Sequence, residues 1–181
     1  QMVERHGDNP RFATAVYGIV DTRTRTVTLA GAGHPHPLRI REDEVLPVAT
    51  EGGLLGVFPE AQFDDATFTM APDEMLVVYS DGFETAFPAP SADEYGRRVP
   101  NSHYLDRFTA MAAAWRTGGL GGALRELSEL IDCQAGSLHQ VDDLTALVVA
   151  PHVDRPVDRL FGEAPSAADH PRPASSPRIH A

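Results

Sequence analysis

The sequence contains no lysine and a single cysteine, Cys133. One cysteine cannot form an internal disulfide, which favours a reducing, cytoplasmic setting. All 15 basic residues are arginine, and 26 acidic residues outnumber them, so the formal net charge is -11. This charge opposes binding to nucleic-acid phosphates and to anionic membrane surfaces. No apolar run reaches the roughly 18 residues of a membrane-spanning helix, so we expect a soluble protein with no nucleic-acid or membrane partner.

The length of 181 residues, with 42% apolar residues, is enough for one hydrophobic core. Residues 151–181 are rich in proline, alanine and serine, and their acidic and arginine side chains cancel in charge. We predict one folded domain over residues 1–150, which then carries the whole negative charge, followed by a disordered tail over residues 151–181.

Apolar patterning predicts both strands and helices. Residues 12–20 are mostly β-branched, aromatic or small, and residues 26–30 alternate in polarity, so the two segments predict an antiparallel hairpin. The continuous apolar run at 75–79 is typical of a strand buried on both faces. The glycine-rich stretch 51–59 is expected to pack its apolar side chains against a sheet. Further strands are predicted at 38–41, around 68–70 and at 144–150, and helices from an N-cap at Ser102 to Gly118 and from Leu124 to Gly136.

Aspartates stand at the ends of two predicted strands. Asp81 directly follows the apolar run 75–79, and Gly82 would let the backbone turn away without placing a side chain in the site. Asp142 and Asp143 directly precede the last predicted strand. Carboxylates suit magnesium or manganese, provided that the two strands are neighbours in one sheet. The patterns also fit an ordinary Asp-Gly turn and a solvated strand edge, and spacing alone does not decide between these interpretations.

Other residues have weaker chemical signals. His34 lies in a corner rich in glycine and proline, where it could approach a phosphate or only shape the corner. Met111 and Trp115 recur at helical spacing and are expected in the core. Cys133 is expected to be a small buried apolar residue of the second helix.

Five blocks of the sequence, in this order, resemble the later half of the SpoIIE-like phosphatase domain, a bacterial branch of the metal-dependent protein phosphatase (PPM) family. The resemblance covers residues 9–150 almost continuously. The blocks are Asn9-Pro10-Arg11-Phe12-Ala13-Thr14-Ala15, Ala32-Gly33-His34-Pro35-His36-Pro37-Leu38, Gly52-Gly53-Leu54-Leu55-Gly56, Tyr79-Ser80-Asp81-Gly82-Phe83-Glu84-Thr85-Ala86 and Asp142-Asp143-Leu144-Thr145.

The resemblance implies an α+β fold, an antiparallel β-sandwich flanked by helices. It implies hydrolysis of phosphoserine or phosphothreonine with two Mn²⁺ or Mg²⁺ ions, which activate a water molecule. Asp81 and Asp142 match metal-binding positions, while Asp143 and Gly82 would either add a ligand or position the others. The implied substrates are phosphorylated regulatory proteins of the anti-sigma-factor antagonist type, and upstream sensor domains would fit the same pattern.

One motif of the family is missing. Its first metal motif, a Gly-Asp-aromatic block whose aspartate bridges both ions, does not occur in these 181 residues. We therefore expect the chain to be the C-terminal part of an N-terminally truncated phosphatase domain. An alternative hypothesis is a non-catalytic protein-interaction module derived from the same fold.

Overall fold

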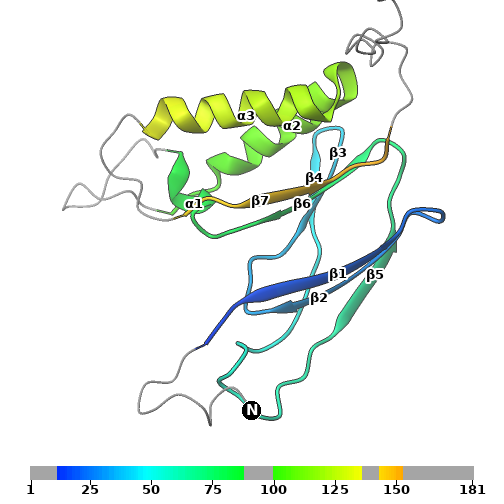
Figure 1. Ribbon diagram of the computed structural model, residues 1–181, viewed down its shortest axis with the longest axis vertical. Helices are drawn as coiled ribbons and strands as arrows, with labels where there is room; N and C mark the ends of the chain where they lie inside the picture. The colour runs from blue at the N-terminus through cyan, green and yellow to red at the C-terminus, as the bar shows by residue number, and fades with distance from the viewer. Residues whose placement is uncertain (1–11, 88–99, 136–142, 153–181) are drawn as a thin grey trace, which may run out of the picture.

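The computed structural model describes residues 12–87, 100–135 and 143–152, and within these ranges the strands form two antiparallel sheets (Figure 1). The first sheet has the order β1-β2-β5 and the second has the order β4-β3-β6-β7. The strands are β1 (Ala15–Asp21), β2 (Thr26–Ala32), β3 (Leu38–Arg41), β4 (Glu44–Pro47), β5 (Asp65–Thr69), β6 (Glu74–Tyr79) and β7 (Ala146–Val149).

The two sheets pack face to face as a sandwich. Between them lies a small apolar cluster to which both sheets and the adjoining loops contribute. Arg39 of β3 also reaches into this layer, where its guanidinium lies 4.4 Å from the ring centre of Phe68 on β5 and its Nε donates to the carboxylate of Glu74 at 2.6 Å. The buried members of the cluster are Val27, Leu29, Val48, Met70 and Leu76.

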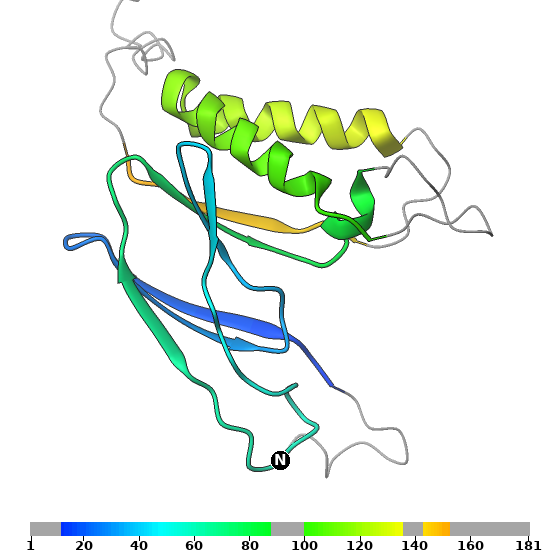
Figure 2. The ribbon, with the colours of Figure 1, turned by 180° about the vertical axis from the view of Figure 1, so that it is seen from behind.

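Two long antiparallel helices, α2 (His103–Gly118) and α3 (Leu120–Ala135), cover the outer face of the second sheet, as the opposite views in Figures 1 and 2 both show. The chain reverses between the helices at Gly119, whose φ of 87° favours glycine. A short helix, α1 (Phe83–Ala86), follows β6 directly. No helix in the described ranges is long and apolar enough to cross a membrane.

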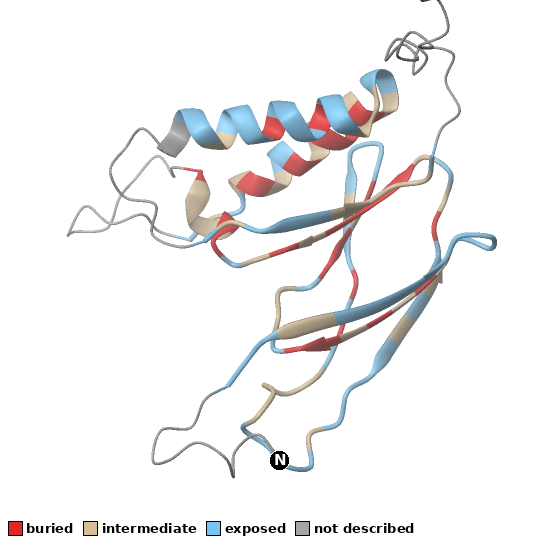
Figure 3. Ribbon diagram, in the orientation of Figure 1, coloured by how far each residue is buried: buried red, intermediate tan, exposed pale blue. Residues whose placement is uncertain are grey.

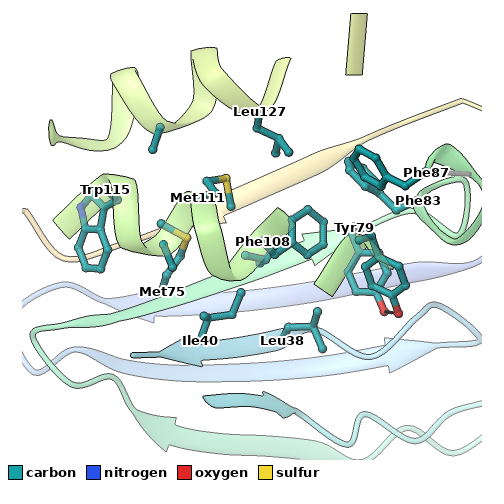
Figure 4. Close-up of a cluster of buried hydrophobic side chains, with 14 residues drawn as sticks. Leu38, Ile40, Met75, Tyr79, Phe83, Phe87, Phe108, Met111, Trp115 and Leu127 are labelled. Carbon is teal, nitrogen blue, oxygen red and sulfur yellow. Dashed lines mark hydrogen bonds between the residues drawn. The ribbon is translucent and has the colours of Figure 1, made fainter. Parts of the chain in front are cut away.

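The largest core lies between these helices and the second sheet (Figure 4). Phe108 of α2 is fully buried and contacts the rings of Tyr79, Phe83 and Tyr104 at centroid distances of 5.0 to 5.8 Å. Trp115 is also buried here. Aromatic and aliphatic side chains from β6, α1 and α2 therefore fix the position of the strand end that Asp81 follows.

The observed architecture confirms the predicted α+β class with an antiparallel sandwich, and it confirms Met111 and Trp115 as core residues. The strand β4 was not predicted, because two of its four residues are glutamate and proline; such composition is typical of an edge strand, and β4 pairs only with β3. The predicted helix end at Gly136 and the predicted tail from residue 153 onward lie outside the described residues.

Two expectations about burial were wrong. Cys133 is exposed, because it lies two residues, or about 200°, around the helix from the half-buried Ile131. The stretch 51–59 does not pack all of its apolar side chains, since Phe58 is 60% exposed. This stretch is held instead by backbone contacts, including paired hydrogen bonds between Ala13 and Leu55.

Candidate active site

Asp81 lies at the end of the most buried strand of the molecule's second sheet. β6 is covered by the helices on one face and by the first sheet on the other, and the chain leaves it through Ser80. Asp81 is exposed, and its backbone carbonyl accepts a hydrogen bond from the Glu84 N–H at 2.9 Å, which begins α1. A rigid strand and a short helix therefore present this carboxylate to solvent.

Ser80 joins the Asp81 turn to the segment before β7. Its hydroxyl donates to the carbonyl oxygen of Asp143 at 3.0 Å and accepts from the backbone N–H of Thr145 at 3.0 Å. Its own N–H donates to the Thr145 carbonyl at 2.9 Å, which extends the β6–β7 ladder by one residue. Two segments more than 60 residues apart in the chain thus meet at one end of the sheet.

Gly82 is required by this close approach. A Cβ atom at this position would lie 2.5 Å from the Asp143 carbonyl oxygen and 3.1 Å from a methyl carbon of Leu144. Its backbone angles, φ -51° and ψ -27°, are those of an ordinary right-handed helix. The need for glycine here therefore arises from the segment packed against it and not from the turn.

The other predicted site residues have different positions. Asp143 is exposed and adjoins Gly82, whereas Asp142 lies outside the described residues. His34 lies in the connection between β2 and β3, where its Nδ1 is 3.3 Å from the Thr14 hydroxyl oxygen. This contact links the connection to the residue that precedes the first sheet.

Beside the Asp81 turn lies a pocket of about 420 Å³ that the sequence did not indicate. Tyr79, Glu84 and Tyr104 contribute to its wall, together with His36 and neighbouring apolar residues. The hydroxyl groups of Tyr79 and Tyr104 are hydrogen bonded at 3.0 Å. Burial, followed by this hydrogen bond, raises the pKa of Tyr79 far above its ordinary value, so the hydroxyl is neutral at physiological pH.

Comparison with known proteins identifies the family. The family described as "Stage II sporulation protein E (SpoIIE)" matches residues 1–152. The chain belongs to the SpoIIE family. "Protein IcfG" of Synechocystis sp. is 31% identical over 145 residues, which are 80% of this chain and 21% of that protein.

Solved structures show the same fold. The SiaA-PP2C domain of Pseudomonas aeruginosa is similar with a TM-score of 0.64 and 19% identity over 82% of this chain. The phosphatase domain of SpoIIE from Bacillus subtilis, in a form described as Mn presoaked, has a TM-score of 0.53 and 19% identity over 80% of this chain. The SpoIIE-family chain spans 56% and 59% of these two structures, so it matches little more than half of each.

The described site residues of this SpoIIE-family chain include a side chain of the type that binds a divalent metal, but too few such side chains gather to form a complete site. Asp81 offers the hard carboxylate oxygens that Mn²⁺ and Mg²⁺ prefer. In residues 12–87, 100–135 and 143–152, however, no three or more His, Cys, Asp or Glu side chains gather where they could hold an ion. The described residues therefore supply a part of a metal centre at most.

Proposed function

We propose that this chain contributes part of the active centre of a metal-dependent phosphatase that hydrolyses phosphoserine or phosphothreonine on a regulatory protein. Membership of the SpoIIE family and the shared PP2C-type fold support this proposal. The observation that carries it is the junction made by Ser80, which holds the Asp81 turn against Asp143 at one sheet end. The residue next to Asp143 is the second predicted ligand, Asp142.

In this proposal Asp81 and Asp142 hold Mn²⁺ or Mg²⁺, and Ser80 and Gly82 keep their two segments together. A divalent ion held by carboxylates lowers the pKa of a bound water molecule and stabilises phosphate oxygens during displacement. Asp143 either adds a ligand or positions Asp142. The bridging carboxylate would come from a Gly-Asp-aromatic block, which these 181 residues do not contain.

We propose a phosphorylated protein of the anti-sigma-factor antagonist type as the substrate, in the cytoplasm, with sensor domains upstream as a source of regulation. Similar solved structures support a regulatory protein as the partner. One of them, described as the RsbU and RsbW domains of Rv1364c from Mycobacterium tuberculosis, has a TM-score of 0.53 and 22% identity. The chain covers 37% of that structure, so the substrate and the partners are proposed for the whole protein.

Manganese-dependent release of phosphate from a phosphoserine peptide tests the proposal. The assay compares the 181-residue chain with a longer product of the same gene, on the condition that the gene encodes a Gly-Asp-aromatic block upstream. We expect activity near background for the shorter chain and clear activity for the longer one. In the longer chain, Asp81→Asn and Asp142→Asn should each lower kcat/KM by more than about 100-fold, which exceeds the cost of losing an outer partner of a ligand.

Asp64→Asn provides a matched control, because Asp64 is exposed and lies on the loop before β5. It should leave the rate within about twofold, as expected of a surface change. Full activity in the 181-residue chain would contradict the need for a further motif. Unchanged rates in both Asp81→Asn and Asp142→Asn would contradict the metal assignment, and a longer chain that binds phosphoprotein without turnover would favour the interaction-module hypothesis.

A further inference from the structure

The pocket beside the Asp81 turn, here named the Glu84 pocket, has walls from five parts of the chain. They are the β2–β3 connection and the β3–β4 hairpin, the end of β6, the helix α1 and the first turn of α2. Most of the wall is apolar, and the two tyrosines add ring surface. Its representative residues are His36, Leu38, Tyr79, Glu84, Tyr104 and Leu105.

The Glu84 pocket is close enough to Asp81 for one peptide to reach both. Tyr79 precedes Asp81 by two residues, and Glu84 follows it by one helical turn, a rise of about 5 Å. An extended peptide advances about 3.3 Å per residue. The distance from a phosphorylated residue at Asp81 to the pocket can therefore be spanned by a few residues of peptide.

Glu84 is the acidic residue of the pocket wall and is half-buried. Among the described residues its carboxylate has no ion-pair partner, since the ion pairs join Arg23 to Asp21, Arg39 to Glu74 and Arg41 to Asp73. Arg107, on the nearby turn of α2, has its guanidinium 5.6 Å from the ring centre of Phe87. The carboxylate is therefore available to a cation from outside.

The remaining wall suits the stem of a long basic side chain. Leu38 and Leu105 offer apolar surface to its methylene groups. His36 accepts a hydrogen bond on Nδ1 from the Thr50 N–H at 3.3 Å, which orients its ring in the pocket wall. A net charge of -11 further favours a basic segment over an acidic one.

We propose that the Glu84 pocket binds an arginine or lysine side chain of the protein substrate, a few residues from the phosphorylated residue. The proposal rests on the proposed phosphatase function for the position of the phosphate. It adds a specificity determinant that is separate from the predicted metal ligands, with the cation at the Glu84 carboxylate and the aliphatic stem on the apolar wall.

Peptide binding to the 181-residue chain tests the pocket directly. The probes are fluorescein-labelled phosphoserine peptides in an alanine background, with a single arginine at each position from three before to three after the phosphoserine. Fluorescence anisotropy should show about five- to tenfold tighter binding for at least one arginine position than for the all-alanine peptide. Glu84→Gln should remove this preference, while Glu126→Gln, an equal change of charge on the exposed face of α3, should keep it.

Three results would overturn the proposal. The first is equal binding of a further peptide that carries leucine instead of arginine at the preferred position. The others are an unchanged preference in Glu84→Gln and an equal loss of preference in Glu126→Gln. The first would show an apolar subsite, and the last would show only general charge attraction.

Hydrolysis of the same peptides by the longer gene product with Mn²⁺ separates this proposal from the phosphatase proposal. Arginine-dependent binding without phosphate release would contradict the phosphatase function and leave the basic-side-chain site intact. Phosphate release with the same kcat/KM for all peptides would support the phosphatase function and contradict the role of the Glu84 pocket.

Discussion

The two sheets of the sandwich differ in what lies on their outer faces. The helices α2 and α3 cover β4-β3-β6-β7, whereas in the described part of the chain no helix covers β1-β2-β5. Most of β1 accordingly has the colour of exposed residues in Figure 3. On this uncovered face Tyr17 is 70% exposed and Ile19 is 58% exposed, although both belong to a strand rich in β-branched and aromatic residues. A segment rich in β-branched and aromatic residues therefore indicates a strand. Whether its side chains are buried depends on what packs against each face of the sheet.

The Asp81 turn follows β6, a strand of the sheet that the helices cover. Side chains of β6 are buried on both faces of the sheet, and Ser80 after it is hydrogen bonded to the segment before β7. These contacts restrict the position of the Asp81 turn relative to β7. β1 carries none of the candidate site residues on its strand and is packed on one face only. The contrast predicts that substitutions on the two sheets differ sharply in their effect on stability.

Phe108→Ala should give the largest effect. Phe108 is fully buried between α2 and β6, so the truncation should lower the free energy of unfolding by about 3–5 kcal/mol. Ile19→Ala on the uncovered face should change it by less than about 0.5 kcal/mol. Urea unfolding followed by the fluorescence of Trp115, the single tryptophan, measures both. A similar loss in the two variants would mean that the face of β1 is buried in solution.

Glu74→Gln tests the buried ion pair between β3 and β6 of the second sheet. Glu74 is 2% exposed and accepts hydrogen bonds from Arg39 Nε at 2.6 Å and from the Ala71 N–H at 2.8 Å. Removing its charge leaves the Arg39 guanidinium beside Phe68 without an anion, at a cost of about 2–4 kcal/mol in the free energy of unfolding.

The matched control for this substitution is Asp73→Asn. Asp73 pairs with Arg41 at 3.0 Å, but both side chains are exposed, so the loss of stability should be clearly smaller than in Glu74→Gln. Urea unfolding in low and high salt measures both variants. Equal losses would contradict the distinction between a pair enclosed by two sheets and a pair in solvent.

Sequence reasoning recovered the elements whose side chains face a core. The continuous run of β6 and the helical spacing of Phe108, Met111 and Trp115 follow directly from burial, so the pattern of apolar residues identified them. β4 gave no such signal, because its residues face solvent at a sheet edge. Cys133 shows that the position of a residue around the helix axis, and not only its apolar character, decides whether it is buried.

The site was predictable only in part, for a different reason. The positions of Asp81 and Asp143 at strand ends could be deduced from the adjoining apolar runs, but their proximity depends on the pairing of β6 with β7, which no local pattern encodes. The family resemblance supplied that information. The Glu84 pocket was missed because its residues come from separate elements, and each of them is unremarkable in its own segment.

Gly82→Ala should have the third largest effect. The added methyl group would lie 2.5 Å from the Asp143 carbonyl oxygen, so the segment before β7 must move, at a cost of about 1–3 kcal/mol. The hydrogen bond from Thr145 N–H to Ser80 should weaken, and hydrogen exchange at Thr145 should accelerate.

Gly121→Ala is the control, since no atom lies within 4 Å of a Cβ there. An alanine in a helix should raise the free energy of unfolding by about 0.5–1 kcal/mol. Unchanged exchange at Thr145 in Gly82→Ala would contradict the packing explanation.

Asp21→Asn should have the smallest effect, in the β1–β2 hairpin of the uncovered sheet. Hydrogen bonds from Thr24 and from the Arg23 N–H hold the pKa of the Asp21 carboxyl below its ordinary value of 3.8. Because the pKa is lower in the folded state, the stabilisation is present above pH 3.8 and is lost as the pH falls through the lower folded value. Asp21→Asn should therefore be less stable than the original protein at pH 7, and the gap should narrow below about pH 4. Urea unfolding at pH 7 and at pH 3 measures the gap, and an equal gap at both pH values would show that the Asp21 charge does not stabilise the hairpin.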